Sequence, residues 1–474
     1  MKLLVYTRPR IRDFYHAFGQ ELVGSENCTF MSDHKGLEKV SIMDHFYDAF
    51  NKEVSAKKDN PHLSFEDYHS IHKRCRYLRQ LNEEEATKCI NAMWLAADRI
   101  INENNPDVIF GQVMDSYVTD IFDRVGRQYN KEYTGFLNNM INGYSRLTSR
   151  GELRKYRTVT DEEVLSAWSS LREKTYMPRM QRDFMWNISP FSMFFTKYLK
   201  ERLKVAYYAV AKVIKNDPNN FYYNTVASQS CMSCQGLSYI TPGKYADKAW
   251  QDKVSSAKNR GSKIIYFPLQ FYPECSIDYW GTALEMTDFY TVTERLLDAA
   301  SEQSMIMVKE HPSSMGLRNP AFYEMISKKK NVVLVPFTVF SNDVFDYSDV
   351  VITWTGSVGF EAAVRGIPLI TFGHGYYDKD QSFYRINSLI ELDSLTQIVE
   401  NVLADKKYRF DESGQQSLVQ NMLMGLMPGY VFPLDYKMER QRLERKELQR
   451  LAQSVWDVFS ILGAYAQPLR PGSL

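Results

Sequence analysis

The second half of the chain alternates short apolar runs with longer amphipathic segments. Each run is nearly continuous in apolar residues, which is typical of strands buried on both faces of a parallel sheet. The predicted strands span residues 263–267, 305–309, 332–335, 350–353 and 368–372. The predicted helices between them span residues 287–300, 320–328, 340–347 and 357–365. Strands that alternate with helices predict βαβ units, and hence a Rossmann-like domain over residues 258–415.

The first half begins with the same pattern. It predicts a strand at 3–6 followed by a loop, a long helix at 84–102, a strand at 108–110, a helix at 119–129 and a strand within 131–137. Residues 150–225 favour helix, with a long basic helix at 193–215, and a last helix is predicted at 437–462. We therefore expect an α/β protein with two Rossmann-like domains that face a cleft. The expected boundaries are 1–245 with a helical insertion, 246–430, and a tail at 431–474 whose helix crosses back to the first domain.

The composition excludes several classes of protein. The 474 residues include 58 Lys and Arg against 57 Asp and Glu, a net charge of +1. A nearly neutral chain lacks the basic excess with which a bulk nucleic-acid binder displaces counterions, so nucleic acid is not an expected partner. With 44% apolar residues, 23 Gly and 17 Pro, the chain is expected to fold rather than stay disordered.

Targeting and cysteine patterns indicate a cytoplasmic protein. The apolar runs are too short to span a bilayer, and the first residues predict a short strand rather than a signal peptide. Cys231 and Cys234 form the only CxxC of the six cysteines, and no second pair completes a zinc site. We therefore expect reduced, structural thiols.

The first chemical motif is Lys309-Glu310-His311-Pro312, directly after a predicted strand. Ligands of open α/β sheets bind beyond the carboxyl ends of the strands. A histidine held there beside a proline can donate a hydrogen bond to a phosphate or protonate a leaving phosphate. A loop histidine packed beside a proline is the simpler alternative.

The second motif spans residues 353–361, where a small-residue turn separates a strand from a helix. The start of a helix exposes unpaired N–H groups and a partial positive charge. Gly356 allows close backbone approach, and Thr355 and Ser357 add hydroxyl groups, which together suit a phosphate without a metal. Glu361 lies on the same helical face as Ser357 and could accept hydrogen bonds from ribose. The alternative is an ordinary N-cap serine followed by a surface glutamate.

Three further candidates lie in loops. The proline-bracketed segment 267–274 holds Gln270 and Glu274 and suits recognition of a base or sugar, or is simply a rigid connection. Asp115 follows a predicted strand and could be a general base. The alternative role for Asp115 is a helix N-cap, and the alternative candidate for the base is Asp120. Arg146 could bind a sugar carboxylate, although a surface arginine is the simpler interpretation.

Two weaker features concern metal and membrane. Residues 378–380 have the DxD spacing of some divalent-ion sites, but one such motif in a polar loop is a weak signal. The helix at 193–215 carries six basic residues against one glutamate, and the segment 437–450 is also rich in charge. Contact with an anionic membrane and a solvated helix face explain these segments equally well.

Three motifs together resemble a known family. FPLQFYPE at 267–274, VKEHP at 308–312 and TWTGSVGFEAAVRGIPLITFG at 353–373 occur in this order in bacterial capsule polysaccharide biosynthesis proteins. Within that group the chain looks most like Kdo transferases. The resemblance covers residues 260–380 and extends less closely over 100–160. The His-Pro motif and the serine at a helix start also appear in sialyltransferases that use CMP-activated sugars.

The resemblance implies a GT-B glycosyltransferase that binds its acceptor in the first domain and its donor in the second. It implies inverting transfer from a nucleotide sugar, CMP-Kdo or a related ulosonic acid, with no metal or other cofactor. His311 would contact the phosphate and assist its departure, Ser357 and Gly356 would bind it, and Glu361 would meet the ribose. Asp115 would be the acceptor base. The remaining donor-site residues implied are Gln270, Glu274, Lys309, Pro312 and Thr355.

The implied partners are a nucleotide-sugar donor, a glycan or glycolipid acceptor, and the inner face of the cytoplasmic membrane as a peripheral contact. Tyr272 and residues 275–278 depart from the run usually seen in the family, which leaves the donor sugar open. The alternatives are a CDP-glycerol or polyol-phosphate transferase, a nucleotide-sugar 2-epimerase, and a non-catalytic scaffold of a polysaccharide assembly complex. The first of these favours an Asp-Tyr-Ser-Ser run where this chain has Thr353-Trp354-Thr355-Gly356-Ser357.

Overall fold

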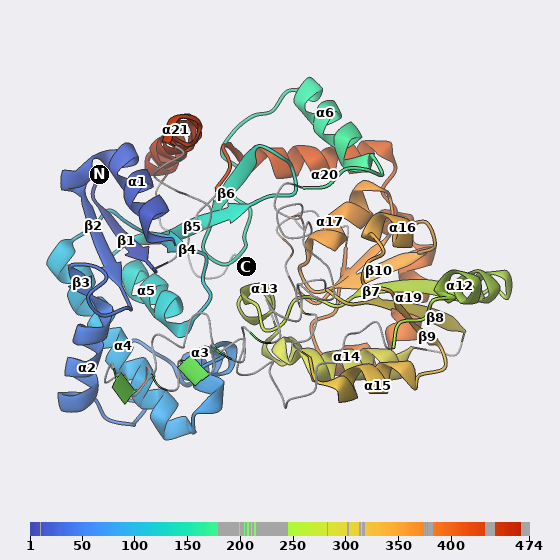
Figure 1. The fold of residues 1–474 in the computed structure, drawn as a ribbon, viewed down its shortest axis with the longest axis horizontal. Coiled ribbons are helices and arrows are strands. Elements are labelled where there is room, and N and C mark those ends of the chain that lie inside the picture. The colour runs from blue at the N-terminus through green and yellow to red at the C-terminus, as the bar shows by residue number, and fades with distance from the viewer. Residues whose placement is uncertain are drawn as a thin grey trace. The chain divides into compact units, whose positions relative to one another are not determined.

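A computed structural model of the chain shows two compact units (Figure 1). It describes residues 1–9, 11–178, 245–281, 283–300, 303–311, 314, 318–373, 375, 377, 383–431 and 441–465, with seven single residues between 199 and 214. The first unit comprises Met1–Thr158 and Leu423–Leu474, and the second comprises Val159–Met422. This division differs from the expected boundaries at 245 and 430, because residues from Val159 onward pack with the second unit.

The first unit contains a seven-stranded sheet with strand order β13-β6-β5-β4-β1-β2-β3. Neighbouring strands from β3 to β5 pair in parallel, and β6 runs antiparallel to both of its neighbours. The strands are β1 (Leu3–Thr7), β2 (Cys28–Ser32), β3 (Val40–Ser41), β4 (Val108–Gln112), β5 (Glu132–Asn138), β6 (Tyr144–Thr148) and β13 (Met427–Pro428). The helices are α1 (Arg12–Val23), α2 (Ile42–Lys52), α3 (Phe65–Arg74), α4 (Glu83–Asn104), α5 (Tyr117–Gln128) and α21 (Gln441–Tyr465), with short 3-10 turns at Ser25–Asn27 and Leu78–Gln80.

Helix α4 illustrates how local sequence sets these boundaries. The Asn82 side chain accepts a hydrogen bond from the backbone N–H of Glu85 (2.9 Å), and three glutamates occupy the first turn. Both features stabilise a helix N-terminus, the second because acidic groups offset the helix dipole. The helix ends at Asn105, whose left-handed backbone (φ 39°) is a common stop.

The last helix completes the core of the first unit. In α21, Leu451, Val455 and Val458 are buried in the same hydrophobic cluster as Phe14 and Phe18 of α1. The apolar face of α1 is therefore covered by a helix from the far end of the chain.

The second unit contains a six-stranded, wholly parallel sheet with order β12-β11-β10-β7-β8-β9. The strands are β7 (Lys263–Pro268), β8 (Ser304–Lys309), β9 (Val332–Val335), β10 (Val350–Thr353), β11 (Leu369–Thr371) and β12 (Tyr384–Arg385). The helices are α6 (Asp161–Arg172), α12 (Trp250–Asn259), α13 (Cys275–Asp278), α14 (Phe289–Ala299), α15 (Pro320–Ser327), α16 (Ser341–Phe345), α17 (Ser357–Val364), α18 (Leu389–Leu392), α19 (Leu395–Ala404) and α20 (Glu412–Met424), with 3-10 turns at Leu284–Thr287 and Lys406–Tyr408.

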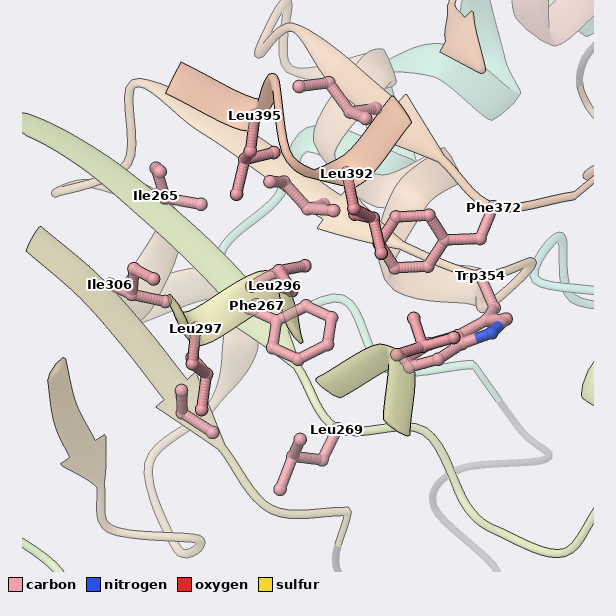
Figure 2. Packing of buried hydrophobic residues seen from close by; sticks show 14 of the residues in the cluster. Ile265, Phe267, Leu269, Leu296, Leu297, Ile306, Trp354, Phe372, Leu392 and Leu395 are labelled. Atoms are coloured by element: carbon pink, nitrogen blue, oxygen red, sulfur yellow. The ribbon is translucent and has the colours of Figure 1, made fainter. Parts of the chain in front are cut away.

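Figure 2 shows the core on one face of this sheet. Phe267 of β7, Ile306 of β8 and Leu296 of α14 pack together there. Trp354 follows β10 and is fully buried between Phe289 and Phe372, and its indole N–H donates to the carbonyl of Met286 (2.9 Å). This tryptophan of the predicted phosphate motif is therefore a core residue.

The α/β fold class is confirmed, since each unit is built on a sheet of mainly parallel strands covered by helices. All five strands predicted in the second half are observed, within one residue at each end. A loop does follow β1, but helix α1, which begins at Arg12, and strand β2 after it were not predicted. The predicted helix at 193–215 lies mostly outside the described residues. Within the described part of the chain, no helix is long and apolar enough to cross a membrane.

Candidate active site

Three loops of the second unit meet at one edge of its sheet. Strand β7 lies between β10 and β8, and the three strands are parallel, so their carboxyl ends lie side by side. The residues that follow them are Gln270 after β7, Glu310 and His311 after β8, and Thr355, Gly356 and Ser357 after β10. The structure therefore brings the predicted donor residues to the edge where parallel sheets bind ligands.

Gln270 connects two of these loops. Its side-chain amide donates to the hydroxyl of Ser276 and lies 3.5 Å from Thr355 Oγ1, while its Oε1 accepts from the Thr355 backbone N–H (3.4 Å). Thr355 in turn donates its hydroxyl to the carbonyl of Ser276 (2.9 Å), and Glu274 accepts from the Ser276 hydroxyl (2.5 Å). Gln270 and Thr355 are buried, so their observed role is to hold the β7 and β10 loops together.

Glu310 forms a buried network behind His311. Its carboxylate accepts hydrogen bonds from Arg318 Nε (2.6 Å), from the Tyr323 hydroxyl (2.6 Å) and from the backbone N–H of His311 (2.5 Å). Arg318 also donates to the carbonyl of Gln270 (2.5 Å), and its guanidinium lies 4.4 Å from the ring centre of Phe289. Sequence reasoning assigned no role to Glu310 or Arg318. In the sequence, the available signal for Glu310 was the position of a charged residue directly after the largely apolar strand β8.

Lys309 and His311 flank this glutamate. Burial lowers the pKa of Lys309 to about 8, although the negative charges of Glu310 and Glu361 oppose the shift. His311 is half-buried, and its ring centre lies 5.7 Å from that of Phe271. Pro312 lies outside the described residues. The pair therefore offers a buried amine and a partly exposed imidazole at the end of one strand.

Helix α17 begins at Ser357, and Gly356 rather than Ser357 is its N-cap. The alternative of an ordinary N-cap serine is therefore wrong. Ser357, Gly356 and Glu361 are all partly exposed, so this helix start is accessible. A side chain at Gly359 would meet the Tyr377 hydroxyl at 2.2 Å, and that hydroxyl donates to the carbonyl of Gly356 (3.0 Å). Tyr377 thus fixes the turn that precedes the helix.

The first unit has its own polar edge, at the carboxyl ends of β1, β2 and β4. Asp115 after β4 accepts two hydrogen bonds from Arg8 after β1, at 2.6 and 3.0 Å. The N-cap of α5 is Ser116, so the alternative of Asp115 as an N-cap is wrong. Asp120, the competitor, is wholly buried and paired with Arg124 and Arg150.

Arg146 occupies an internal position on β6. It is 1% exposed and donates to the carbonyl of Gly151 (3.1 Å), so the alternative of a surface arginine is wrong. This contact ties β6 to the loop that follows it. The structure does not bring Arg146 to an exposed edge, and binding of a sugar carboxylate by this side chain remains a prediction.

A cavity of about 500 Å³ lies at the opposite edge of the second sheet, where β7, β10 and β11 begin. Two basic side chains that line the cavity contact backbone carbonyls. Lys258 Nζ lies 3.5 Å from the carbonyl oxygen of Tyr347, and Arg409 donates to the carbonyl of Leu403 (2.6 Å). The cavity is therefore separate from the predicted donor residues. Among the described residues no group of three or more His, Cys, Asp or Glu could hold a metal ion, and the DxD motif at 378–380 lies outside them.

The fold defines an α/β protein, and one edge of its second sheet carries the predicted phosphate-site residues. Residues 196–380 match the model described as "Capsule polysaccharide biosynthesis protein". This stretch contains β7 to β11 and all the candidate residues of the second unit. The resemblance to capsule polysaccharide biosynthesis proteins is therefore confirmed over this stretch, which is less than half of the chain.

Several solved structures are similar to the chain. The Thermosulfurimonas dismutans KpsC beta Kdo 2,7 transferase is 11% identical, over 95% of this chain and 99% of that one, with a TM-score of 0.36. The beta Kdo 2,4 transferase of the same KpsC is 12% identical over 67% and 79%, with a TM-score of 0.33. The Neisseria meningitidis UDP-GlcNAc 2-epimerase is 12% identical over 90% and 100%, with a TM-score of 0.25. The fold class rests on the chain's own sheets rather than on these distant likenesses. A search of curated proteins finds no match.

Proposed function

We propose that this chain is a glycosyltransferase that moves an acidic sugar from a CMP-activated donor to a glycan or glycolipid acceptor during capsule or surface polysaccharide synthesis. The observation that carries the proposal is the meeting of His311, Lys309 and the start of α17 at one edge of the second sheet. The family match over the same residues supports it.

The chemistry requires groups that stabilise a departing phosphate. His311 can donate a hydrogen bond or a proton to a phosphate oxygen, and proton transfer contributes about 10²–10⁴-fold to such reactions. The first turn of α17 offers backbone N–H groups and a partial positive charge, with Ser357 adding a hydroxyl. These groups need no metal. In the first unit, the acceptor is proposed to bind at the edge that carries Asp115, the candidate proton acceptor.

The test is calorimetric titration of wild type and His311→Ala with CMP, CDP, UDP and GDP, with and without EDTA. We expect selective CMP binding that EDTA leaves unchanged and that His311→Ala weakens at least tenfold. The matched control is His62→Ala, an exposed histidine that stacks on Trp94 in the first unit. Selective UDP binding would favour an epimerase or a UDP-sugar transferase, and no nucleotide binding would favour a scaffold.

The proposal extends to single-displacement inversion at the anomeric carbon. Incubation with CMP-Kdo and an acceptor, followed by NMR of the first-formed product, reports the anomeric configuration. Inverted configuration supports direct attack by the acceptor. Retained configuration contradicts it, while transfer itself would still stand.

A peripheral membrane contact is also proposed. Leu203, Tyr207, Val210, Val213 and Ile214 recur at helical spacing, and each is more than half exposed. The surrounding sequence is rich in Lys and Arg, a combination that suits an anionic bilayer surface. Cosedimentation should occur with phosphatidylglycerol vesicles and not with phosphatidylcholine vesicles, and Val210→Asp with Val213→Asp should abolish it. Equal binding to both vesicle types would contradict the charge argument.

A further inference from the structure

The cavity of about 500 Å³ at the amino edge of the second sheet carries an excess of positive charge. It is lined by the loops that precede β7, β10 and β11 and by residues at and after the end of α19. Its charged side chains are the cations of Lys258, Lys263 and Arg409 and the single carboxylate of Asp349. Ligands of parallel sheets bind at the carboxyl edge, so the proposed donor site leaves this cavity without a role.

The carboxylate and one of the three cations are already paired. Asp349 Oδ2 accepts a hydrogen bond from the backbone N–H of Ile264 (2.8 Å), and Asp349 Oδ1 lies 3.5 Å from Lys258 Nζ. The unbalanced charge of the cavity therefore belongs to Lys263 and Arg409.

Three side chains at the cavity have hydrogen-bond donors to spare. Within the residues that the structure describes, neither the Lys263 ammonium nor the Ser262 hydroxyl has a hydrogen-bond or ion-pair partner. Arg409 donates from Nη2 to the carbonyl of Leu403 (2.6 Å), and its other N–H groups have no partner in that part of the chain. Lysine and arginine side chains have donors and no acceptor. The ligand that matches this set is an anion with several acceptor oxygens.

Capping of helix ends is the simpler explanation for basic residues at this edge. Lysine and arginine side chains near a helix C-terminus commonly bond its last carbonyls, and Leu403 lies in the last turn of α19. This explanation accounts for one nitrogen of Arg409. It does not account for Lys263, which begins strand β7 and whose side chain bonds to no carbonyl among the described residues.

The size and the apolar wall of the cavity indicate a ligand larger than a free phosphate ion. Ile367, Pro368 and Leu403 form part of the lining. Small-molecule sites usually measure about 300–1,000 Å³, and this cavity falls in that range. A phosphate monoester carries close to two negative charges at neutral pH, which balances the charges of Lys263 and Arg409.

We propose that this cavity is a binding site for a phosphate monoester of a small molecule. Lys263, Arg409 and Ser262 donate to the phosphate oxygens, and the apolar wall contacts the organic part of the ligand. A soluble ligand and the headgroup of phosphatidic acid both present this chemistry, and the experiment distinguishes them. The inference is independent of the proposed function, because none of these residues belongs to the donor edge or to the edge that carries Asp115.

The probe is glycerol 3-phosphate, titrated by calorimetry into wild type, Lys263→Gln, Arg409→Gln and the double variant, with glycerol as the uncharged comparison. Wild type should bind glycerol 3-phosphate and not glycerol. Charge-assisted hydrogen bonds to phosphate are strong, so each single change should weaken binding at least about threefold and the double variant at least about tenfold. Both side chains are exposed, so the variants should fold. The CMP affinity of the double variant should stay within about twofold of wild type, because the donor edge is separate.

The matched control is Lys330→Gln. Lys330 is an exposed lysine that precedes β9 at the same edge of the sheet, and it does not line the cavity. The affinity of this variant for glycerol 3-phosphate should stay within about twofold of wild type. An equal loss in Lys330→Gln and Lys263→Gln would overturn the inference, as would a double variant that binds the probe as tightly as wild type.

Cosedimentation with phosphatidic acid vesicles, compared with phosphatidylcholine vesicles, identifies the source of the phosphate. Vesicle binding that the double variant loses assigns the site to the lipid headgroup. Binding of glycerol 3-phosphate without vesicle binding assigns it to a soluble ligand. A wild-type protein that binds neither probe overturns the inference and leaves the proposed function untouched.

Discussion

Glu310 and Arg318 form an ion pair that solvent barely reaches: their side chains are 0% and 1% exposed, and Arg318 Nε lies 2.6 Å from Glu310 Oε2. Through its second contacts the pair fixes the His311 backbone on one side and the Gln270 carbonyl on the other. The ends of β7 and β8 are thereby held at one separation. This edge of the sheet is thus held by two buried residues whose described contacts are with protein groups.

Arg318→Met should therefore destabilise the second unit strongly. It would leave the buried Glu310 carboxyl without its cation, and breaking a buried ion pair in this way typically costs about 3–5 kcal/mol. Urea denaturation should report this loss, and CMP affinity should fall at least tenfold. Arg295→Met removes an ion pair of the same length, Arg295 to Asp393 at 2.6 Å, in an exposed position. That control should cost only about 0–1 kcal/mol, and equal losses in the two variants would contradict the burial argument.

The pKa of about 8 at Lys309 predicts a pH effect on donor binding. The side chain is charged below pH 8 and neutral above it, so CMP affinity should fall between about pH 7.5 and pH 9. Lys309→Met should bind CMP more weakly than wild type at neutral pH and without this dependence. Calorimetry across the range checks both, and a parallel decline in the variant would assign the effect to another group.

Lys309 also affects stability. Its folded pKa lies below the ordinary value of 10.5, so the unfolded chain binds more protons between about pH 8 and 10.5. The free energy of unfolding should rise with pH in that window for wild type, relative to Lys309→Met. Denaturation curves at both ends of the window measure the free energy of unfolding of each protein. The wild-type value minus the Lys309→Met value should be larger at the upper end of the window.

Glu152 predicts a pH effect of the same sign in the first unit, with stability rising with pH in an acidic window. Burial alone would raise its pKa, but Arg154 and the backbone N–H groups of Ser149 and Arg150 bring the pKa down to about 2. Glu152→Gln should lower the free energy of unfolding at pH 7 by about 1–3 kcal/mol, as expected for lost hydrogen bonds to a charged group. This deficit should be fully present above pH 4.5 and should narrow as pH falls towards 2. A constant deficit at acid pH would show that ionisation is not the cause.

Gly359→Ala should disturb the start of α17. The new Cβ would lie 2.2 Å from the Tyr377 hydroxyl, which fixes the Gly356 carbonyl, so both stability and CMP affinity should fall. Tyr377→Phe removes the clashing oxygen, and the alanine should therefore cost less in that background. Gly414→Ala, in α20 of the same unit, is the control and should change stability by about 1 kcal/mol or less. Equal costs of Gly359→Ala in both backgrounds would contradict the proposed contact.

The strands of the second sheet could be predicted because each is a continuous apolar run between helical patterns. Strand β2 could not, since Cys28–Ser32 is short, partly polar and only half-buried along most of its length. Helix α1 was missed because its apolar face consists largely of aromatic residues interrupted by Gly19 and His16. Arg146 was misjudged for a similar reason, as no local pattern shows that an arginine points inward.

The candidate site was only partly visible in the sequence. His311 and Ser357 follow predicted strands, and the structure brings them to one edge. The ion pair between Arg8 and Asp115 depends on the pairing of β1 with β4, which are far apart along the chain. A charged residue directly after a buried strand was the available signal, and Arg8 after β1 met that criterion.

The route of the chain between the units has a consequence for synthesis on the ribosome. The second unit is one uninterrupted stretch, whereas the first needs residues after Leu423 to cover the apolar face of α1. Chains emerge N-terminus first, and domains generally fold as units during this process. Phe14 and Phe18 therefore lack this cover until the residues of α21 have been made. The unit that starts first along the chain is the one that can finish folding only last.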